Sequence, residues 1–316
     1  KGEVNALNNL SLAYYSIGDY PKAIEPLQRS LKIAQDIKDS EGEGKVLNNL
    51  GATYYKQGNF QLAESSLFQG VKVLESLRGG LKDNHQITIF EEQSRTYRTL
   101  QQVLIAQNKS DAALEIAERG RARAFVELLA SKLSDNPNEQ LSTQPNIEQI
   151  KQIAKLQNAT LVQYSIVDDE LKVEGKRQVK ESKLYIWVVK PTDEIVFKQV
   201  DLTSINKSLE ELVISARDSM EVRGSNMFDV AVVTPSQEDP TQKLKQLHKL
   251  LIAPIADLLP QDPNEQVIFI PQESLFTVPF PALLDEKGKY LIEKHTILTA
   301  PSIQVLDLTR QQKQRN

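Results

Sequence analysis

The chain has 316 residues, of which 40% are hydrophobic and 25% are charged, a balance that is typical of folded domains and excludes an intrinsically disordered chain. It carries 38 Lys and Arg against 42 Asp and Glu, a net charge of −4, which excludes the broad cationic surface of a typical nucleic-acid-binding protein. No uncharged apolar run approaches the roughly 18 residues that a membrane-spanning helix needs. The absence of cysteine excludes disulfides, thiolate metal sites and a cysteine nucleophile in this chain.

These numbers favour a cytoplasmic protein of about two domains, since a domain has roughly 150 residues. We expect no nucleic-acid partner, no membrane association, no metal site and no small-molecule cofactor. The chain begins at Lys1, directly on a helical pattern. We therefore expect it to be a piece of a longer protein, in which any targeting segment would lie outside this piece.

The first part of the chain repeats itself, since residues 7–31 align without gaps on residues 47–71. The aligned pairs are Leu10 with Leu50, Tyr14 with Tyr54, Gly18 with Gly58, Ala23 with Ala63 and Leu27 with Leu67. A weaker third copy places Leu100, Asn108, Ala113 and Ala117 at matching positions. A fixed period of roughly 20–50 residues indicates stacked units, none of which can bury its apolar face alone.

Each unit is predicted to be a pair of helices. In the first unit, apolar residues recur every three or four positions in residues 4–17 and again in residues 23–34, which places them on one face of each helix. Gly18 and Asp19 lie between the two patterns, where glycine suits a helix end and aspartate suits the next cap. Pro26 deletes a hydrogen bond inside the second helix, and we expect it to kink that helix at a cost of about 3 kcal/mol.

The pattern L-x-x-x-Y-x-x-x-G-x-x-x-x-A resembles the tetratricopeptide repeat, in the longer-period variety seen in kinesin light chains. The alternative is an unrelated helical bundle with a chance similarity. The resemblance implies that the repeats bind a protein or peptide. In such repeats the first helix of each pair lines the inner face of the stack.

The residues at those places match between the two units: Asn8, Asn9 and Tyr15 in the first correspond to Asn48, Asn49 and Tyr55 in the second. In repeats of this kind, asparagines there can hydrogen-bond the backbone of an extended peptide, and tyrosines offer apolar area with a polar tip. We therefore predict peptide contact for the group Asn8, Tyr15, Asn48 and Tyr55. The alternative is that one asparagine of each pair only satisfies neighbouring helix ends.

A long helix is predicted over residues 111–133, with Ser110 as its cap. Within it, Arg119 and Arg123 lie one turn apart and could bind a carboxylate or a phosphate. The alternative is a solvated helix face, on which these arginines pair with the glutamates of the same helix, Glu115 and Glu127.

Residues 134–146 are polar, contain two prolines and show no apolar periodicity, which predicts a linker. The expected division is therefore 1–133 for the repeats and the long junction helix, 134–146 for the linker, and 147–316 for a second domain.

The second domain changes to strand chemistry. A short helix begins at Asn146, which forms a capping-box pattern with Gln149. Strands are predicted at residues 160–166, 183–189, 194–200, 266–270 and 295–299, and helices near residues 202–222 and 242–259. The strand at 266–270 is apolar almost throughout, as expected where both faces of a sheet are covered. This order of strands and helices favours an α/β layered domain.

The string I270-P-Q-E-S-L-F-T-V-P-F-P-A-L-L284, followed by Tyr290-Leu-Ile-Glu293 and Ala300-Pro-Ser302, resembles the first half of the CHAT domain. That caspase-like module is often attached to tetratricopeptide repeats, frequently in bacteria. Residues 118–123, ERGRAR, are similar to the junction segment of those proteins. The two resemblances together imply a bacterial protein of class α + α/β: an α-solenoid of helical hairpins followed by a partial caspase-like α/β domain.

The resemblance implies the interaction and regulatory portion of a caspase-like cysteine peptidase. In that family a His-Gly motif and a cysteine follow the Ala-Pro-Ser segment; the histidine activates the thiolate and backbone N–H groups hold the oxyanion. This chain has no cysteine, and its histidines, His85, His248 and His295, lie outside any His-Gly pair. We therefore assign no catalytic residue, and the alternative function is a non-enzymatic adaptor or scaffold.

Overall fold

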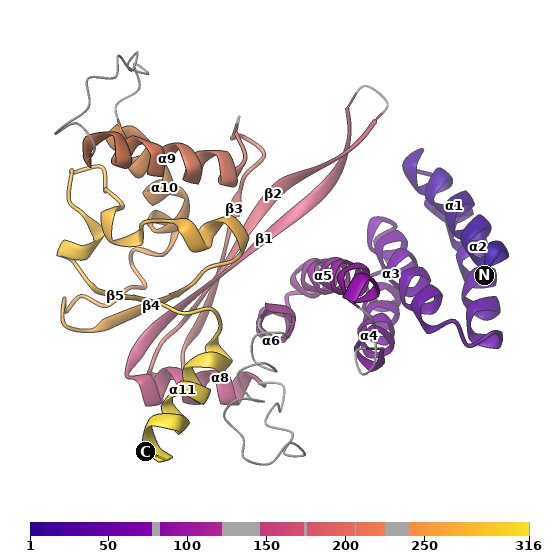
Figure 1. The fold of residues 1–316 in the computed structure, drawn as a ribbon, viewed down its shortest axis with the longest axis horizontal. Helices are drawn as coiled ribbons and strands as arrows, with labels where there is room; N and C mark the ends of the chain where they lie inside the picture. Colours follow the sequence, from indigo (N-terminus) through magenta and orange to yellow (C-terminus); the bar gives the residue numbers. More distant parts are fainter. Residues whose placement is uncertain (78–82, 122–145, 174–175, 206, 225–239, 316) are drawn as a thin grey trace. The chain divides into compact units, whose positions relative to one another are not determined.

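The computed structural model describes residues 1–77, 83–121, 146–173, 176–205, 207–224 and 240–315 (Figure 1). The chain forms two compact units, Lys1–Gly120 and Arg121–Asn316. The first is helical and the second is built on a mixed β-sheet, which confirms the predicted fold class of helical hairpins followed by an α/β region. Residues 134–145 of the expected linker lie outside the described ranges, so the division at 134–146 stays a prediction.

Six helices form the described part of the first unit: α1 (Gly2–Ser16), α2 (Tyr20–Asp36), α3 (Ser40–Lys56), α4 (Phe60–Ser76), α5 (Asp83–Ala106) and α6 (Ser110–Arg121). Successive helices from α1 to α5 pack against one another, and α3 also contacts α1 and α5. This is the stacking of helical hairpins that the repeat predicted. The helix predicted over residues 111–133 corresponds to α6 as far as Arg121, and its remainder lies outside the described ranges.

The turns inside the three hairpins have the same geometry, which confirms the third copy. Gly18, Gly58 and Asn108 occupy matching positions and adopt φ of 82°, 83° and 59°. The residue after each of them donates its backbone N–H to the carbonyl five residues earlier, at 2.9–3.0 Å. A left-handed residue followed by such a bond is a common way to end a helix, and Asn tolerates it better than other non-glycine residues.

Small residues are buried inside the hairpins. Ala23, Ala63 and Ala113 are fully buried at matching positions in the second helix of each hairpin. Tyr54 is buried and its hydroxyl accepts a 3.2 Å hydrogen bond from the side chain of Gln28, whereas the matching Tyr14 is half-buried. Tyr54 differs from Tyr14 in that its helix, α3, packs against the hairpin of α1 and α2.

The sheet of the second unit has the order β3-β2-β1-β4-β5. The strands are β1 (Ala159–Val173), β2 (Lys176–Val189), β3 (Ile195–Asp201), β4 (Gln266–Ile270) and β5 (Thr296–Thr299). β1, β2 and β3 pair antiparallel, whereas β1, β4 and β5 pair parallel. The four residues 267–270 of β4 are at most 1% exposed between two neighbouring strands, which confirms the predicted buried strand.

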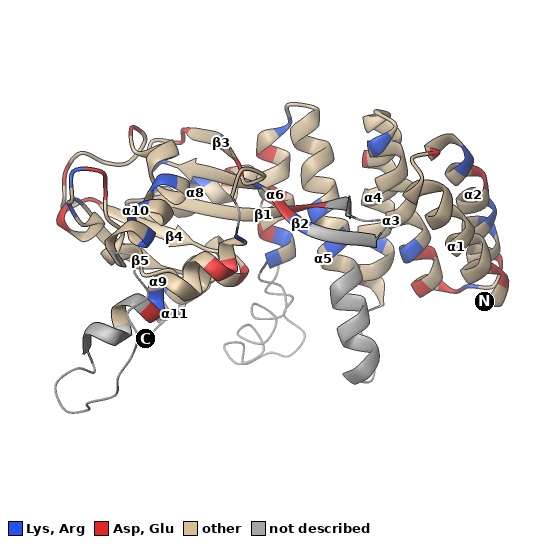
Figure 2. Ribbon diagram, turned by 90° about the horizontal axis from the view of Figure 1, so that it is seen from above, with Lys and Arg blue, Asp and Glu red and all other residues tan. Residues whose placement is uncertain are grey.

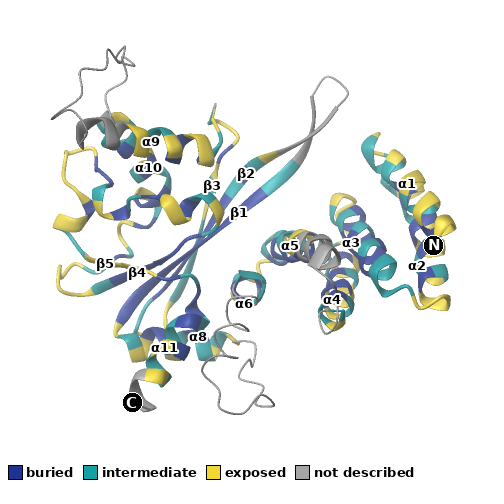
Figure 3. Ribbon diagram, viewed as in Figure 1, coloured by how far each residue is buried: buried dark blue, intermediate teal, exposed yellow. Residues whose placement is uncertain are grey.

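Helices cover both sides of this sheet (Figures 1 and 3). One side carries α9 (Leu209–Gly224) and α10 (Pro240–Leu251), together with the short 3-10 helices η2 (Glu273–Thr277) and η3 (Phe280–Ala282). Alternate residues of β1 and β2, such as Val162, Tyr164 and Ile186, form a common core with them, because side chains alternate between the faces of a strand. The other side carries α8 (Ile147–Gln157) and α11 (Ile303–Arg315).

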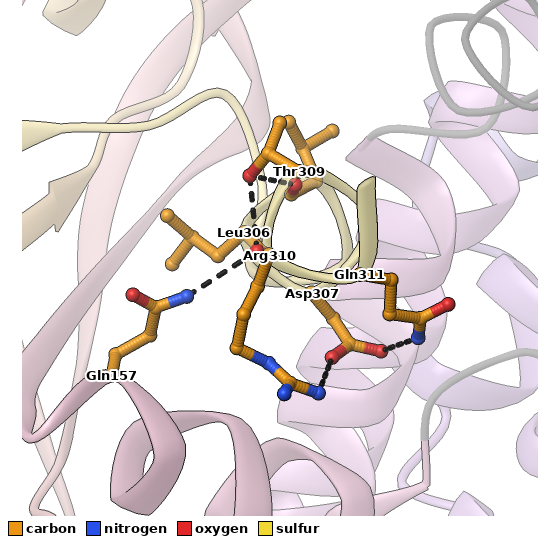
Figure 4. A network of polar contacts seen from close by, with 7 residues as sticks. Gln157, Leu306, Asp307, Thr309, Arg310 and Gln311 are labelled. Carbon is orange, nitrogen blue, oxygen red and sulfur yellow. Dashed lines mark hydrogen bonds and ion pairs between the residues drawn. The ribbon is translucent and has the colours of Figure 1, made fainter. Parts of the chain in front are cut away.

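Polar contacts fix α8 at both of its ends. At its start, the backbone N–H of Gln149 donates to Asn146 Oδ1 and that of Asn146 donates to Gln149 Oε1, both at 2.9 Å, which confirms the predicted capping box. At its end, Gln157 Nε2 donates to the carbonyl of Leu306 in α11 at 3.3 Å (Figure 4). Asp307 lies beside this contact and accepts bonds from Arg310 and Gln311 of the same helix.

Candidate functional site: the inner face of the repeats

We use the term inner face for the side of α1 and α3 that carries the matching asparagines and tyrosines, Asn8, Tyr15, Asn48, Asn49 and Tyr55. The two helices are the first members of their hairpins, and they contact each other. In each helix the predicted tyrosine lies seven positions after the predicted asparagine. That spacing is close to two full turns, so both project from the same side of the helix.

Asn8 and Asn49 join the two repeats directly. The Nδ2 of Asn49 donates a 2.7 Å hydrogen bond to the Oδ1 of Asn8, and both side chains are half-buried. The two residues occupy neighbouring, non-matching positions of their repeats, because the residue that matches Asn8 is Asn48. This bond supports the alternative view of the sequence, in which one asparagine of a pair serves the stacking of the repeats.

Asn48 lies in the interior, where a ligand on the surface does not reach it. Its side chain is 1% exposed, and within the described part of the chain its Oδ1 accepts no hydrogen bond. The matching Asn8 is more accessible because α3 has helices on both sides, α1 and α5, whereas α1 has α3 on one side. Contact between Asn48 and a peptide, as predicted, therefore requires this side chain to move.

Tyr15 and Tyr55 form equivalent aromatic pairs that the sequence analysis did not identify. The ring of Tyr15 meets that of Tyr20 edge-on at a centroid distance of 5.4 Å, and the ring of Tyr55 lies 5.9 Å from that of Phe60. All four rings are half-buried. The signal was present in the sequence, because Tyr20 and Phe60 are related by the same offset of the repeat as Tyr15 and Tyr55.

Both signs of charge occur on these helices (Figure 2). The ammonium group of Lys56 lies 5.8 Å from the centroid of the Tyr55 ring, within the range of a cation–π contact. Lys45 in α3 forms an ion pair with Glu41 at 2.7 Å. The inner face therefore offers amides, partly exposed aromatic rings and a lysine beside one of those rings.

Arg119, predicted to bind a carboxylate or phosphate, binds a carboxylate of its own unit. Its guanidinium makes two hydrogen bonds to Glu75, one of them from Nε to Oε1 at 2.8 Å. The hydroxyl of Tyr97 donates to the same Oε1 at 2.5 Å. Glu75 of α4 is thus a partner of Arg119 that the sequence did not suggest, and the network ties α4, α5 and α6 together. Arg123 lies outside the described residues.

His248 and His295 are both half-buried in the second unit, and the charge of Lys294 acts on both. Burial lowers the pKa of His248 in α10, and burial together with the neighbouring Lys294 lowers the pKa of His295, which precedes β5. His85 lies in the first turn of α5. Among the described residues, no three His, Asp or Glu side chains gather in a way that could hold a metal ion.

No helix within the described ranges is long and apolar enough to cross a membrane. Residues 2–76 match the tetratricopeptide repeat family, and residues 241–316 match the CHAT domain family. The chain is similar to tetratricopeptide repeat protein 28 of Homo sapiens, at 23% identity over 308 residues, and to that of Mus musculus, at 31% identity over 86 residues.

The alignments cover 72% and 27% of this chain but only 12% of the human protein and 4% of the mouse protein. The chain therefore spans a small fraction of these relatives. Both are animal proteins and give no support to a bacterial origin, which stays a prediction. Tetratricopeptide-repeat sequence thus occupies residues 2–76 of the chain, and CHAT-domain sequence occupies residues 241–316.

Proposed function

We propose that this chain binds an extended protein segment along the inner face of its repeats, and that it is the interaction and regulatory portion of a caspase-like cysteine peptidase. The observation that carries the binding proposal is the repetition of one arrangement. An aromatic pair lies at the same place in each of the first two repeats, and the Asn8–Asn49 bond lies between those repeats.

The spacing of helices suits an extended ligand. Packed helices are about 8–10 Å apart, and an extended chain advances about 3.3 Å per residue. Each repeat therefore corresponds to about three residues of ligand, so that side chains at that interval would meet successive aromatic pairs. The amides of Asn8 and Asn49 can exchange their mutual bond for bonds to the ligand backbone, since each has a donor and an acceptor.

The peptidase part of the proposal concerns the longer protein. Without a cysteine, this chain cannot form the covalent intermediate of a cysteine peptidase. The CHAT match supports a peptidase-related region, and the proposal places a His-Gly motif and a cysteine in the sequence beyond residue 316. A continuation that lacks both would leave the second candidate, a non-enzymatic adaptor, which the repeats support equally well.

We further propose a cytoplasmic protein that has protein partners and no nucleic-acid partner. The absence of cysteine fits a reducing compartment. The net charge of −4 does not favour contact with a polyanion. These statements depend on composition alone.

A matched set of variants tests the binding face. Partners captured from source cells by the whole chain would be identified, and the affinity of each purified partner measured for the wild type, for Tyr15→Ala/Tyr55→Ala and for Phe68→Ala. Phe68 is an exposed aromatic residue of α4, outside the inner face. We expect the double variant to bind at least tenfold more weakly and the control to bind like the wild type. Unchanged binding of every partner by the double variant would rule out this face.

A further inference from the structure

A cavity in the second unit gathers three lysines. It lies between the loop that follows β3, helix α9 and helix α10, and its volume is about 420 Å³. Lys207 comes from the loop, and Lys243 and Lys249 come from α10. Ser204 and Ser215 also line it, and the hydroxyl of Ser215 donates to the carbonyl of Leu212 at 3.2 Å. The cavity thus combines ammonium and hydroxyl donors from three separate segments of the chain.

Two of the three lysines at this cavity, Lys207 and Lys249, lack an acidic partner among the described residues. No Asp or Glu is among the described residues that line it. Across the described ranges, neither Lys207 nor Lys249 has a carboxylate within ion-pair distance. The nearby Glu211 accepts a 3.1 Å hydrogen bond from the backbone N–H of Ser208 and so caps α9. Like charges that converge on a hollow raise the local concentration of anions.

The same cavity has an apolar portion. Ile205, Leu212 and Leu250 contribute to its lining, and Leu212 is almost completely buried. A cavity of this size lies at the small end of the range for small-molecule sites, about 300–1,000 Å³, in which apolar walls carry a few polar groups. An occupant with a compact anionic end and an organic body would match both parts of the lining.

We propose that this cavity binds a small organic phosphate. A phosphate group carries up to two negative charges on oxygens that only accept hydrogen bonds, which suits lysine and serine donors. Lysine binds phosphate as a point charge and does not need the fixed fork of arginine. The apolar wall formed by Ile205, Leu212 and Leu250 would contact the organic part. This site is independent of the inner face of the repeats.

The test uses inorganic pyrophosphate as the probe and the whole chain as the receptor. Binding would be measured by titration calorimetry at low salt and again at about 0.15 M salt, where screening removes weak surface attraction. We expect saturable binding that Lys207→Gln/Lys249→Gln weakens at least about tenfold, because each lost ammonium removes a charged hydrogen bond. Lys245→Gln is the matched control, because Lys245 lies in α10 but does not line the cavity.

A charge-preserving variant and a second anion complete the test. Lys207→Arg/Lys249→Arg keeps the charge and should retain binding, and circular dichroism should show wild-type melting for both double variants because both lysines are exposed. Citrate, a carboxylate anion of similar charge, should bind at least tenfold more weakly than pyrophosphate. The proposal is overturned if pyrophosphate does not saturate the chain, if citrate binds equally well, or if Lys245→Gln causes the same loss as the double variant.

Discussion

The side-chain amide of Asn49 donates a 2.7 Å hydrogen bond to the Oδ1 of Asn8, which lies 41 residues earlier in the chain. The bond connects the first helices of two hairpins at a place where both side chains remain partly accessible. The two side chains therefore join the repeats through a polar contact, and a ligand can also reach them. Its contribution to stability and its contribution to binding can be measured separately.

Removal of this bond should destabilise the repeats by a small amount. We expect Asn8→Ala and Asn49→Ala each to lower the free energy of unfolding by about 1 kcal/mol, as is typical of one hydrogen bond. The double variant should lose less free energy of unfolding than the two single variants lose together, because both changes remove the same contact. Urea unfolding of the four proteins gives this coupling. If the two effects add fully, the side chains do not interact in solution.

The close approach of α3 and α4 predicts opposite results at two buried glycines. A Cβ at Gly51 would lie 2.7 Å from Leu67 Cδ2, whereas a Cβ at Gly70 would come no closer than 3.4 Å to any neighbouring atom. Gly51→Ala should therefore lower the free energy of unfolding by about 1–3 kcal/mol through overpacking. Gly70→Ala should be neutral or stabilising by up to about 1 kcal/mol, because alanine is the better helix former.

Gly70→Ala serves as the matched control, since both glycines are buried in neighbouring helices. The midpoints of chemical unfolding of the two variants would be compared with that of the wild type. An equal effect of the two substitutions would contradict the predicted close contact between Gly51 and Leu67.

The Glu75–Arg119 pair should contribute more to the free energy of unfolding than an exposed ion pair of the same unit. The side chains of Arg119 and Glu75 are 21% and 11% exposed, whereas Lys109 in the Lys109–Glu64 pair is 44% exposed. We expect Arg119→Ala to cost about 2 kcal/mol, because it leaves a largely buried carboxylate with fewer donors. Lys109→Ala should cost less than about 1 kcal/mol.

Thermal and urea unfolding of these two variants provide the comparison. The loss at Arg119 should persist at high salt, because buried pairs are screened little, while the loss at Lys109 should disappear. If both variants lost the same stability at every salt concentration, burial would not strengthen the Glu75–Arg119 pair.

Much of the fold could be predicted because the signals are local. Repetition located the turn residues Gly18, Gly58 and Asn108, including the asparagine that replaces glycine. The apolar residues 267–270 located β4, whose observed bounds, Gln266–Ile270, are those predicted. These features depend on the residues next to them in the chain, so one sequence was enough to read them.

The predicted elements had the wrong length in two situations. Charged residues made part of a strand look unlike a strand, and a helix N-cap was overlooked. β1 and β2 run beyond the predicted strands as a ribbon in which Asp169 pairs in register with Lys180, and opposite charges across a pair stabilise such a ribbon. α9 begins at Leu209 instead of residue 202, because Ser208 and Glu211 form a capping box. That Ser-x-x-Glu signal was present in the sequence.

The candidate site was predicted less well, because burial depends on neighbours that a single repeat does not specify. Asn48 and Asn8 occupy the same position of the repeat, yet one is buried and the other is half-buried, since only α3 has helices on both sides. Likewise, no pattern in sequence brings Lys207 near Lys249, which lie in different elements and meet at a cavity only when the chain folds.

Acid should destabilise the second unit in two separate steps. Burial lowers the pKa of His248 and His295 below 6.5, so the unfolded chain binds protons first, and the free energy of unfolding falls as pH drops below about 6.5. The hydrogen bond from Lys294, supported by the backbone N–H of Lys289, lowers the pKa of Asp285 from 3.8 to about 2. Its contribution is therefore complete above pH 3.8 and is lost as pH falls towards 2.

Melting temperatures measured from pH 7.5 to pH 2.5 separate the two steps. The double variant His248→Gln/His295→Gln should show a smaller fall in melting temperature between pH 7 and pH 5 than the wild type, because glutamine takes up no proton. Asp285→Asn should reduce the pH dependence below pH 4, since the group it removes titrates there. It should slightly steepen the fall between pH 7 and pH 5, because the Asp285 carboxylate raises the pKa of His248 in the folded chain. A wild-type fall between pH 7 and pH 5 in the double histidine variant would show that other groups control stability in that range.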